Sequence, residues 1–88
     1  MLDIFYTSRF KRDYKKVKKR GKDLKKLESV ITLIVQEKLL PQNLKDHTLI
    51  GNYAYRRECH IEPDWLLIYK LEEDKVIFER TGSHSDLF

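Results

Sequence analysis

Apolar residues recur along the chain with two different periods, and the change of period divides the chain into elements. Residues 2–7 alternate apolar and polar side chains and are rich in strand-forming types, which predicts a strand. From Phe10 to Val17 the apolar positions recur at helical spacing, with lysines and arginines between them. Ser8 is predicted to cap this helix at its N-terminus, and Gly21 is predicted to end it.

A second helix is predicted from the N-cap residue Asp23 onward. Its apolar side chains form a wide stripe, made of Leu24, Leu27, Val30, Ile31, Ile34 and Val35. Pro41 ends the pattern at or before Leu40, because the residue before a proline avoids helical backbone angles. Two helices joined by a short glycine turn form an antiparallel hairpin, and the apolar stripe is most simply core.

The second half of the chain has the composition of strands. Residues 42–52 form a loop without clear periodicity, and three strands follow at 53–60, 64–71 and 76–80, with a tail from Thr81. Short connections make consecutive strands antiparallel. The predicted fold class is α+β, with an N-terminal strand and an antiparallel two-helix hairpin packed on one face of a mainly antiparallel four-stranded sheet. The other face of the sheet is left for a ligand.

Length and composition limit what the chain can be. Its 88 residues are expected to form a single domain, 1–88, with a modest core. One cysteine excludes an intrachain disulfide and suits a reducing compartment. The N-terminal residues lack the apolar stretch of a signal peptide, and no apolar run is long enough to cross a bilayer. We therefore expect a soluble, cytoplasmic protein without membrane contact.

Positive charge is concentrated in the predicted helices. Between Arg9 and Lys26 there are eleven lysines and arginines against two acids, a net charge of +9, and the other residues carry −5. Such a segment favours a polyanion or an acidic protein partner. A solvated helix face is an equally good interpretation of the charge run alone.

Residues that can move protons or hold a phosphate gather in the last third of the chain. His60 and Asp64 flank a predicted turn, and a carboxylate beside an imidazole fixes the tautomer of the ring. A surface histidine beside a surface aspartate is the plainer alternative. His84 follows the last strand in a polar tail, and Arg80, at the end of that strand, carries a planar fork that matches phosphate oxygens.

Two further side chains can join these residues. His47 lies on the loop before the sheet, and Phe88 either packs into the core or offers a ring for base stacking. In an ideal hairpin Arg80 shares a face with Trp65 and not with His60. Bringing Arg80 to the site therefore requires a β-bulge, which the sequence does not reveal.

A metal site is the competing interpretation of the histidines, the aspartate and the cysteine. Cys59 and His60 are adjacent in a predicted strand and so point to opposite faces. The sequence has no CxxC or HxxxH pair. We therefore predict no metal and no cofactor, and we expect Cys59 to pack in the core.

Three segments, KDHTLIGNY, YRRECHIEPDWLLIYKL and FERTGSHSDLF, resemble the RelE-type bacterial toxins, in particular their YafQ-like branch. The resemblance covers nearly the whole chain. It implies a RelE-like fold and a ribosome-dependent endoribonuclease that cuts messenger RNA and is neutralised by an antitoxin. It also implies the functional positions, which are His47, His60, Asp64, Trp65, Arg80, His84 and Phe88. Glu58 is left out, because a relative carries the shorter aspartate there.

The chemistry of RNA cleavage assigns roles to these residues. When a 2′-hydroxyl attacks its own 3′ phosphate, it needs a base, an acid for the leaving oxygen and a cation for the phosphoryl charge. We assign His84 as the acid, Arg80 as the phosphate clamp and Asp64 as the orienting carboxylate. The base is His60 or His47, and the sequence does not decide between them.

The remaining expectations concern binding. Trp65, Phe88 and Lys45 are expected to contact the nucleotide, and the basic helix is expected to hold ribosomal RNA. The alternative function is a non-catalytic protein of the same fold, either a gyrase inhibitor or a nucleic-acid-binding module. More distant members of the superfamily lack the histidines, so the histidines of this chain favour the ribonuclease.

Overall fold

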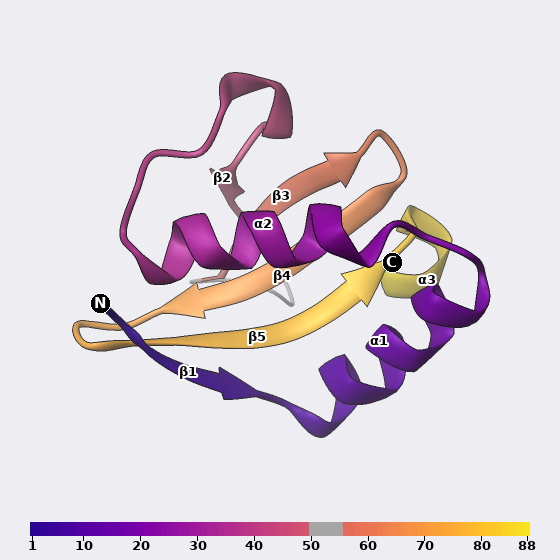
Figure 1. Ribbon diagram of the computed structural model, residues 1–88, viewed down its shortest axis with the longest axis horizontal. Coiled ribbons are helices and arrows are strands. Elements are labelled where there is room, and N and C mark those ends of the chain that lie inside the picture. The colour runs from indigo at the N-terminus through magenta and orange to yellow at the C-terminus, as the bar shows by residue number, and fades with distance from the viewer. Residues whose placement is uncertain (50–55) are drawn as a thin grey trace.

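A mixed sheet organises the part of the chain that the computed structural model describes, which is residues 1–49 and 56–88. Within these residues the sheet has five strands in the order β1-β5-β4-β3-β2. Strand β1 runs parallel to β5, and the other neighbours are antiparallel (Figure 1). The strands are β1 (Asp3–Tyr6), β2 (His47–Thr48), β3 (Arg57–Glu62), β4 (Trp65–Leu71) and β5 (Lys75–Gly82).

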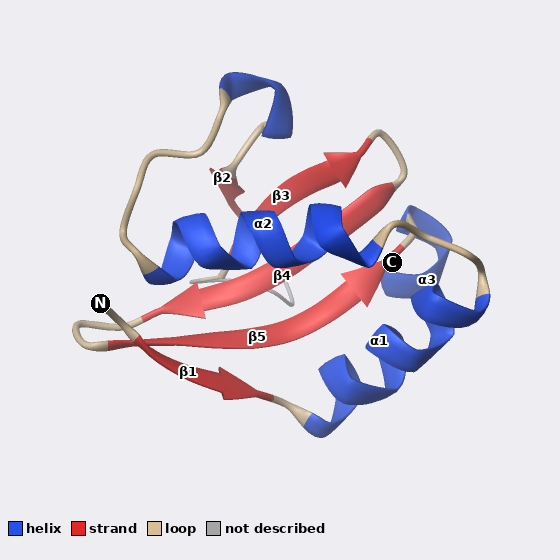
Figure 2. Ribbon diagram, viewed as in Figure 1, coloured by secondary structure: helices blue, strands red, loops and turns tan. Residues whose placement is uncertain are grey.

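The helices are α1 (Ser8–Lys19), α2 (Leu24–Val35) and α3 (His84–Leu87), with a 3-10 turn η1 (Gln42–Leu44). Helix α2 crosses one face of the sheet, and α1 lies along the end of β5 (Figure 2). The structure confirms the predicted α+β class. It adds the short strand β2, which lies in the segment that we predicted to be a loop.

The main core fills the space between α2, α1 and the sheet. Alternate residues of β4 point into it, and the largest buried side chains there are those of Trp65, Tyr69 and Phe78. A second, smaller cluster lies on the opposite face, where Leu66 and Ile68 pack with Leu87 of α3. The sheet is therefore covered by helices on one face, while α3 covers only part of the other.

The first helix begins one residue earlier than predicted. Its N-cap is Thr7 and not Ser8, because the Thr7 hydroxyl oxygen accepts the backbone N–H of Phe10 at 3.0 Å. The same hydroxyl donates to the backbone carbonyl of Glu79 at 2.8 Å. The Thr7 hydroxyl therefore bonds both the first turn of α1 and the backbone of β5. Ser8 lies inside the first turn and cannot make both bonds.

The predicted stop at Gly21 is confirmed. Gly21 is left-handed, with φ 78°, and its N–H donates to the carbonyl of Lys18 at 3.1 Å. The N–H of Lys22 donates to the carbonyl of Val17 at 3.2 Å. These two bonds form a Schellman motif, which satisfies the last carbonyls of α1.

Helix α2 ends at Val35, well before the predicted limit at Leu40. Glu37 takes the left-handed conformation, with φ 59°, and its N–H donates to the carbonyl of Ile34 at 3.0 Å. A non-glycine residue is uncommon in this region of backbone angles. Pro41 therefore predicts a limit for α2, but the residue that ends the helix is Glu37.

Two other predicted boundaries change. The predicted strand at 53–60 begins at Arg57 within the described residues, and its positions 53–55 lie outside them. The predicted tail is ordered, since Thr81 and Gly82 complete β5 and residues 84–87 form α3. Among the helices in the described ranges, none has the length and apolar content needed to span a membrane.

Candidate active site

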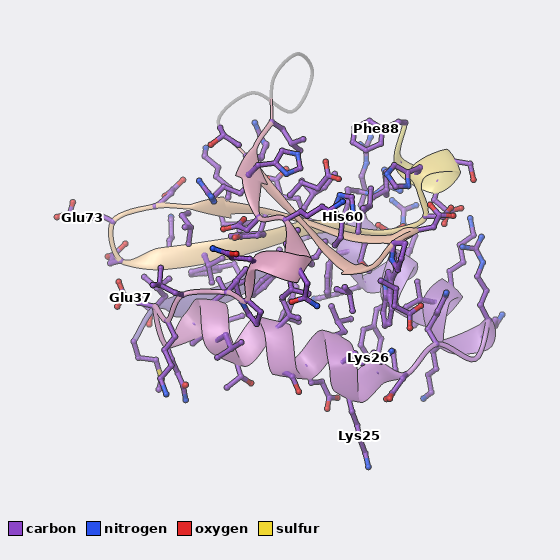
Figure 3. The ribbon with its side chains drawn as sticks, turned by 90° about the horizontal axis from the view of Figure 1, so that it is seen from above. Lys25, Lys26, Glu37, His60, Glu73 and Phe88 are labelled. Atoms are coloured by element: carbon purple, nitrogen blue, oxygen red, sulfur yellow. The ribbon has the colours of Figure 1, made fainter. Side chains whose placement is uncertain are left out.

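Three imidazoles meet on the face of the sheet that α2 does not cover. His47 comes from β2, His60 from β3 and His84 from α3. The ring centroids of His47 and His60 are 6.2 Å apart, and those of His60 and His84 are 5.7 Å apart. Figure 3 shows His60 and Phe88 on the far side of the sheet from α2. The structure therefore brings together three histidines that are widely separated in the sequence.

A buried carboxylate lies between two of these rings. Glu58 is 5% exposed, and its Oε1 lies 3.0 Å from Nε2 of His60. Its Oε2 lies 3.7 Å from Nε2 of His47, because strand pairing sets His47 directly opposite Glu58. Glu58 is not among the predicted site residues. The missed signal is its spacing of two residues from His60, which puts both side chains on one face of a strand.

The predicted contact between Asp64 and His60 is wrong, because Asp64 binds His84. Asp64 Oδ1 accepts the backbone N–H of His84 at 2.8 Å and lies 2.6 Å from its ring Nδ1. These bonds lower the pKa of Asp64, the backbone bond most and the ring bond next. A register shift at the end of β3 and the turn after Glu62 carry Asp64 past His60 towards α3. Asp64 therefore orients the imidazole of His84, the assigned acid, and not that of His60.

The short helix α3, which positions His84, is held by Asp86. Ser83 and Asp86 form a capping box, in which Asp86 Oδ2 accepts the backbone N–H of Ser83 at 2.9 Å. Asp86 Oδ1 accepts Nη2 of Arg20 at 3.0 Å and Nζ of Lys16 at 3.3 Å. The Arg20 guanidinium holds the pKa of Asp86 well below its usual range. Part of the basic run on α1 is therefore structural.

Gly82 allows the Asp86 side chain to lie close to the backbone at the end of β5. A Cβ atom at Gly82 would lie 2.9 Å from Asp86 Oδ2 and 3.0 Å from Asp86 Cβ, closer than real contacts of this kind. The residue also has φ 156°, which side chains disfavour. Glycine is therefore required where β5 turns into α3.

The bulge that Arg80 requires is present in β5. Phe78 pairs with Tyr69 and Arg80 pairs with Ile68, so Glu79 is the extra residue. Directly paired residues share a face of the sheet. Ile68 belongs to the small cluster opposite the main core, and Arg80 is therefore in register with the face that carries the histidines.

The guanidinium of Arg80 is held by Asp13 of α1. Arg80 Nε donates to Asp13 Oδ2 at 2.7 Å, and Nη2 donates to Oδ1 at 3.1 Å. Asp13 is 8% exposed and also accepts the backbone N–H of Thr81 at 3.2 Å. Arg9 and Arg12 join this pair around a depression of about 170 Å³. The ion pair fixes the position of Arg80, and two further cations lie beside it.

The expected nucleotide contacts divide into two groups. Trp65 is fully buried and donates from Nε1 to the Thr81 hydroxyl at 3.0 Å, so its predicted contact with substrate is wrong. Phe88 is 65% exposed on the histidine face. Lys45 lines, with His60, a depression of about 380 Å³. Phe88 and Lys45 are therefore accessible to a bound strand.

Cys59 lies in the core, as predicted. It is fully buried on the helix-covered face, and burial raises the pKa of its thiol to about 12. A thiol in this state is neither a nucleophile nor a metal ligand at neutral pH.

Comparison with known proteins gives one consistent family. Residues 2–88 match the family model described as the bacterial toxin of a type II toxin–antitoxin system, YafQ. The mRNA interferase toxin YafQ of Escherichia coli strain K12 is 46% identical over 87 residues, which cover 98% of this chain and 95% of that protein.

Solved structures agree with the family match over the full length. The E. coli DinJ–YafQ complex contains a chain with a TM-score of 0.94 and 44% identity, covering 100% of this chain and 99% of that one. A metal-bound toxin from Helicobacter pylori has a TM-score of 0.93 and 41% identity, covering 100% of both chains.

Proposed function

This chain belongs to the YafQ family of bacterial toxins of type II toxin–antitoxin systems, and on that premise we propose how its histidine site cuts messenger RNA. It is an mRNA interferase, that is, an endoribonuclease. The observation that supports the mechanism is the meeting of three imidazoles with Glu58, from β2, β3 and α3. Each of the three imidazoles has one ring nitrogen bound by a neighbour. For His47 and His84 this contact indicates the protonation state of the other ring nitrogen.

His47 is the general base in this proposal. Its Nδ1 lies 2.6 Å from the backbone carbonyl of Lys45, which can only accept a hydrogen bond, so Nδ1 carries the proton. In the neutral ring Nε2 then has a lone pair and can take the proton of the 2′-hydroxyl. His60 is bonded through Nε2 to Glu58 and supports the phosphoryl group beside it.

His84 is the general acid. Its Nδ1 proton is directed to the Asp64 carboxylate, so the imidazolium can give up its Nε2 proton. The 2′-oxygen forms a bond to phosphorus as the bond from phosphorus to the 5′-oxygen breaks, and that oxygen takes the proton of His84. The products are a 2′,3′-cyclic phosphate and a 5′-hydroxyl.

Cations and an aromatic ring complete the proposed site. Arg80, oriented by Asp13, serves as the phosphate clamp on the same face of the sheet. Phe88 offers a ring for stacking with a base, and Lys45 lies beside His60. Stacking and charge of this kind bind single strands without requiring a particular sequence.

The partners of the chain are proposed from its relatives and its charge. We propose that it acts in the cytoplasm on translating ribosomes, where the exposed cations of α1 bind ribosomal RNA. The E. coli relative is found in complex with DinJ, and a cognate antitoxin is proposed for this chain. We also place the chain in the wider RelE-type superfamily, with residues 1–88 acting as one domain.

A relative from H. pylori is metal-bound, which supports the idea that the site of this chain can accept a metal ion. The donor set fits, because imidazole nitrogens and a carboxylate are ligands for zinc and copper. The proposed cleavage takes no step through such an ion. All proton transfers are assigned to side chains.

The test is cleavage of message on purified ribosomes by His84→Ala and His47→Ala. Each variant is expected to cut about 10²–10⁴-fold more slowly than wild type, with unchanged folding. Lys25→Ala is the control, since that side chain points away from the sheet on the α2 side (Figure 3). A wild-type rate in His84→Ala, or a 5′-phosphate on the downstream fragment, would contradict the mechanism.

A non-catalytic protein of the same fold is the competing function. It predicts that the triple alanine variant at His47, His60 and His84 still arrests growth, while charge reversal between Arg9 and Lys26 abolishes the arrest. The mRNA interferase predicts that the triple variant is harmless to cells.

A further inference from the structure

We propose that the depression beside His60 is a subsite for the nucleobase of the nucleotide whose 2′-hydroxyl attacks, and that Asn43 sets which nucleobase is preferred. The inference rests on the proposed function, because it takes the scissile linkage to lie at the histidines. The lining residues come from η1, the residue after it, the end of β3 and the turn that follows. They are Asn43, Lys45, His60, Ile61, Glu62 and Pro63.

The depression exists because β2 is short. In the described part of the chain β2 pairs only with Arg57 and Glu58, so β3 has no neighbouring strand on that side beyond Glu58. His47 lies opposite Glu58, and two more paired residues would set Lys45 opposite His60. Lys45 instead takes the left-handed conformation, with φ 50°. The chain therefore leaves the strand direction there and opens a space beside His60.

A register shift in β3 shapes the opposite wall. His60 pairs with Leu66 and Glu62 pairs with Trp65, so Ile61 is the extra residue. A bulge of this kind re-aims the side chains next to it. It explains why His60, Ile61 and Glu62 border one depression, although regular alternation would separate neighbouring side chains.

The corner of the chain that carries Lys45 is held in place by Asp46. Asp46 Oδ1 accepts the hydroxyl of Tyr69 at 2.7 Å, and Oδ2 accepts Nη2 of Arg57 at 3.0 Å. The backbone N–H of Lys45 donates to the carbonyl of Gln42 at 3.0 Å. A ligand binds more tightly when the site does not have to be ordered first, so a wall fixed in this way suits a binding site.

The lining has the chemistry of a nucleobase site. Its volume of about 380 Å³ is near the lower end of the range of about 300–1,000 Å³ for small-molecule sites, as suits a single nucleobase. The imidazole of His60 offers a ring for stacking, and Ile61 and Pro63 supply apolar surface. Among the described residues, the amide of Asn43 and the ammonium of Lys45 have no hydrogen-bond partner. Both groups are therefore available to RNA.

The one acid in the lining does not repel RNA. The two carboxylate oxygens of Glu62 accept Nζ of Lys22 at 3.1 Å and Nζ of Lys26 at 3.0 Å. These bonds, that of Lys26 first, lower the pKa of Glu62. The carboxylate therefore stays ionised at neutral pH and is balanced by two cations. With Lys45 added, the rim carries a net positive charge, which favours a polyanion.

The position of His47 decides which nucleotide the subsite serves. The carbonyl of Lys45 lies 2.6 Å from Nδ1 of His47, the proposed general base for the attacking 2′-hydroxyl. The nucleobase of that nucleotide is joined to the same ribose, so a depression bordered by Lys45 is within its reach. His84 and Asp64, which serve the leaving 5′-oxygen, are not among the described residues that line the depression.

Asn43 gives the subsite a selectivity that stacking and charge do not provide. Its amide has both a donor and an acceptor, and so it matches the edge of a nucleobase that offers the complementary pair. An ionised carboxylate at this position could only accept, and would prefer the amino group of cytosine to the carbonyl of uracil. Asn43→Asp is therefore expected to change the preference, and Asn43→Leu to remove it.

The test is cleavage of ribosome-bound messages that carry each of the four nucleobases immediately 5′ of the cut. Wild-type rates should differ by about 5–100-fold, as expected for one bidentate contact. Asn43→Leu should reduce this spread to about twofold, and Asn43→Asp should raise the ratio of cytosine to uracil cleavage by about fivefold or more. Gln42→Ala is the control, because Gln42 belongs to the same turn but does not line the depression. It should keep the wild-type pattern.

A nuclear magnetic resonance titration of the free protein separates this subsite from the proposed mechanism. The probe is a short RNA with 2′-O-methyl groups, which cannot be cut. Its binding should move the side-chain amide signals of Asn43 and leave those of Gln42 in place.

The outcomes are distinguishable. An unchanged preference in both Asn43 variants, or Asn43 signals that stay in place while those of His60 move, would overturn the subsite and leave the ribonuclease standing. Asn43 signals that move, in a protein whose cleavage does not depend on His47 or His84, would overturn the mechanism and keep the nucleobase site.

Discussion

The ion pair between Asp13 and Arg80 joins α1 to the face of the sheet that carries the candidate site. Removing it tests how much the pair stabilises the fold and whether the pair orients Arg80. Asp13 accepts three hydrogen bonds, two from Arg80 and one from the backbone of Thr81. Asp13→Ala removes all three, while Asp13→Asn keeps the oxygen that can accept the N–H of Thr81. The two variants therefore separate the loss of charge from the loss of an acceptor.

The size of the effect follows from burial. The N–H of Thr81 is buried, and leaving such a donor unsatisfied costs about 1–3 kcal/mol. Breaking a fully buried ion pair costs about 3–5 kcal/mol, but the side chain of Arg80 is 20% exposed, so water recovers much of that cost. We expect Asp13→Ala to lower the free energy of unfolding by about 2–4 kcal/mol and Asp13→Asn by about 1–2 kcal/mol.

Urea denaturation followed by circular dichroism measures this difference, and a double-mutant cycle isolates the pair. Arg80→Met removes the cation but keeps the length of the side chain. The double variant should be more stable than the sum of the single changes predicts, by about 1–2 kcal/mol. For a chain of this size, the melting temperature of Asp13→Ala should fall by about 10–20 °C.

Two outcomes would refute this reasoning. If Asp13→Ala unfolds within about 0.5 kcal/mol of wild type, the pair is as weak as an exposed one. If the two changes are additive, Asp13 and Arg80 do not stabilise each other. In either case Asp13 does not fix the guanidinium, and the role of Arg80 as an oriented phosphate clamp loses its structural basis.

Three further substitutions and one labelling experiment have defined outcomes. Gly82→Ala should displace Asp86 and misplace α3, lowering the cleavage rate by about 10²-fold. Gly21→Ala is the control, because an added Cβ at Gly21 would meet no atom within 4 Å. It should lower the free energy of unfolding by about 1–2 kcal/mol and leave the cleavage rate unchanged. Equal cleavage rates in Gly82→Ala and Gly21→Ala would contradict the role of α3. Glu37→Gly should raise the free energy of unfolding by about 0.5–1 kcal/mol in a urea titration, because glycine relieves the strain of the left-handed backbone. A lower free energy of unfolding would show that the contacts of the Glu37 side chain outweigh this strain. Cys59 should resist a maleimide at pH 8 until urea is added, since its pKa is about 12, and rapid labelling of the native protein would contradict its burial.

The sequence was sufficient for the parts of the fold that depend on periodicity. The apolar stripe of α2 and the alternation in the strands are local patterns, and both predicted the correct elements. The glycine that ends α1 was equally readable. Helix α2 was predicted too long, because the left-handed residue that ends it is Glu37, and no rule of composition indicates a glutamate there.

The candidate site was harder to predict, because tertiary packing assembles it. The bulge at Glu79 changes the face of Arg80, and it exists only where β4 and β5 pair. Helix α3 is too short for a periodic signal, although the pair Ser83 and Asp86 has the spacing of a capping box. Glu58 is predictable from strand alternation alone, because it lies two residues before His60 and therefore on the same face of β3.

The parallel pairing of β1 with β5 has a consequence for synthesis. Residues 3–6 of β1 bond to residues 75–78 of β5, so β1 has no partner until nearly all of the chain described here has been made. The three imidazoles meet later still, because α3 follows β5. An unfinished chain therefore lacks both the parallel strand pair and the assembled histidine cluster.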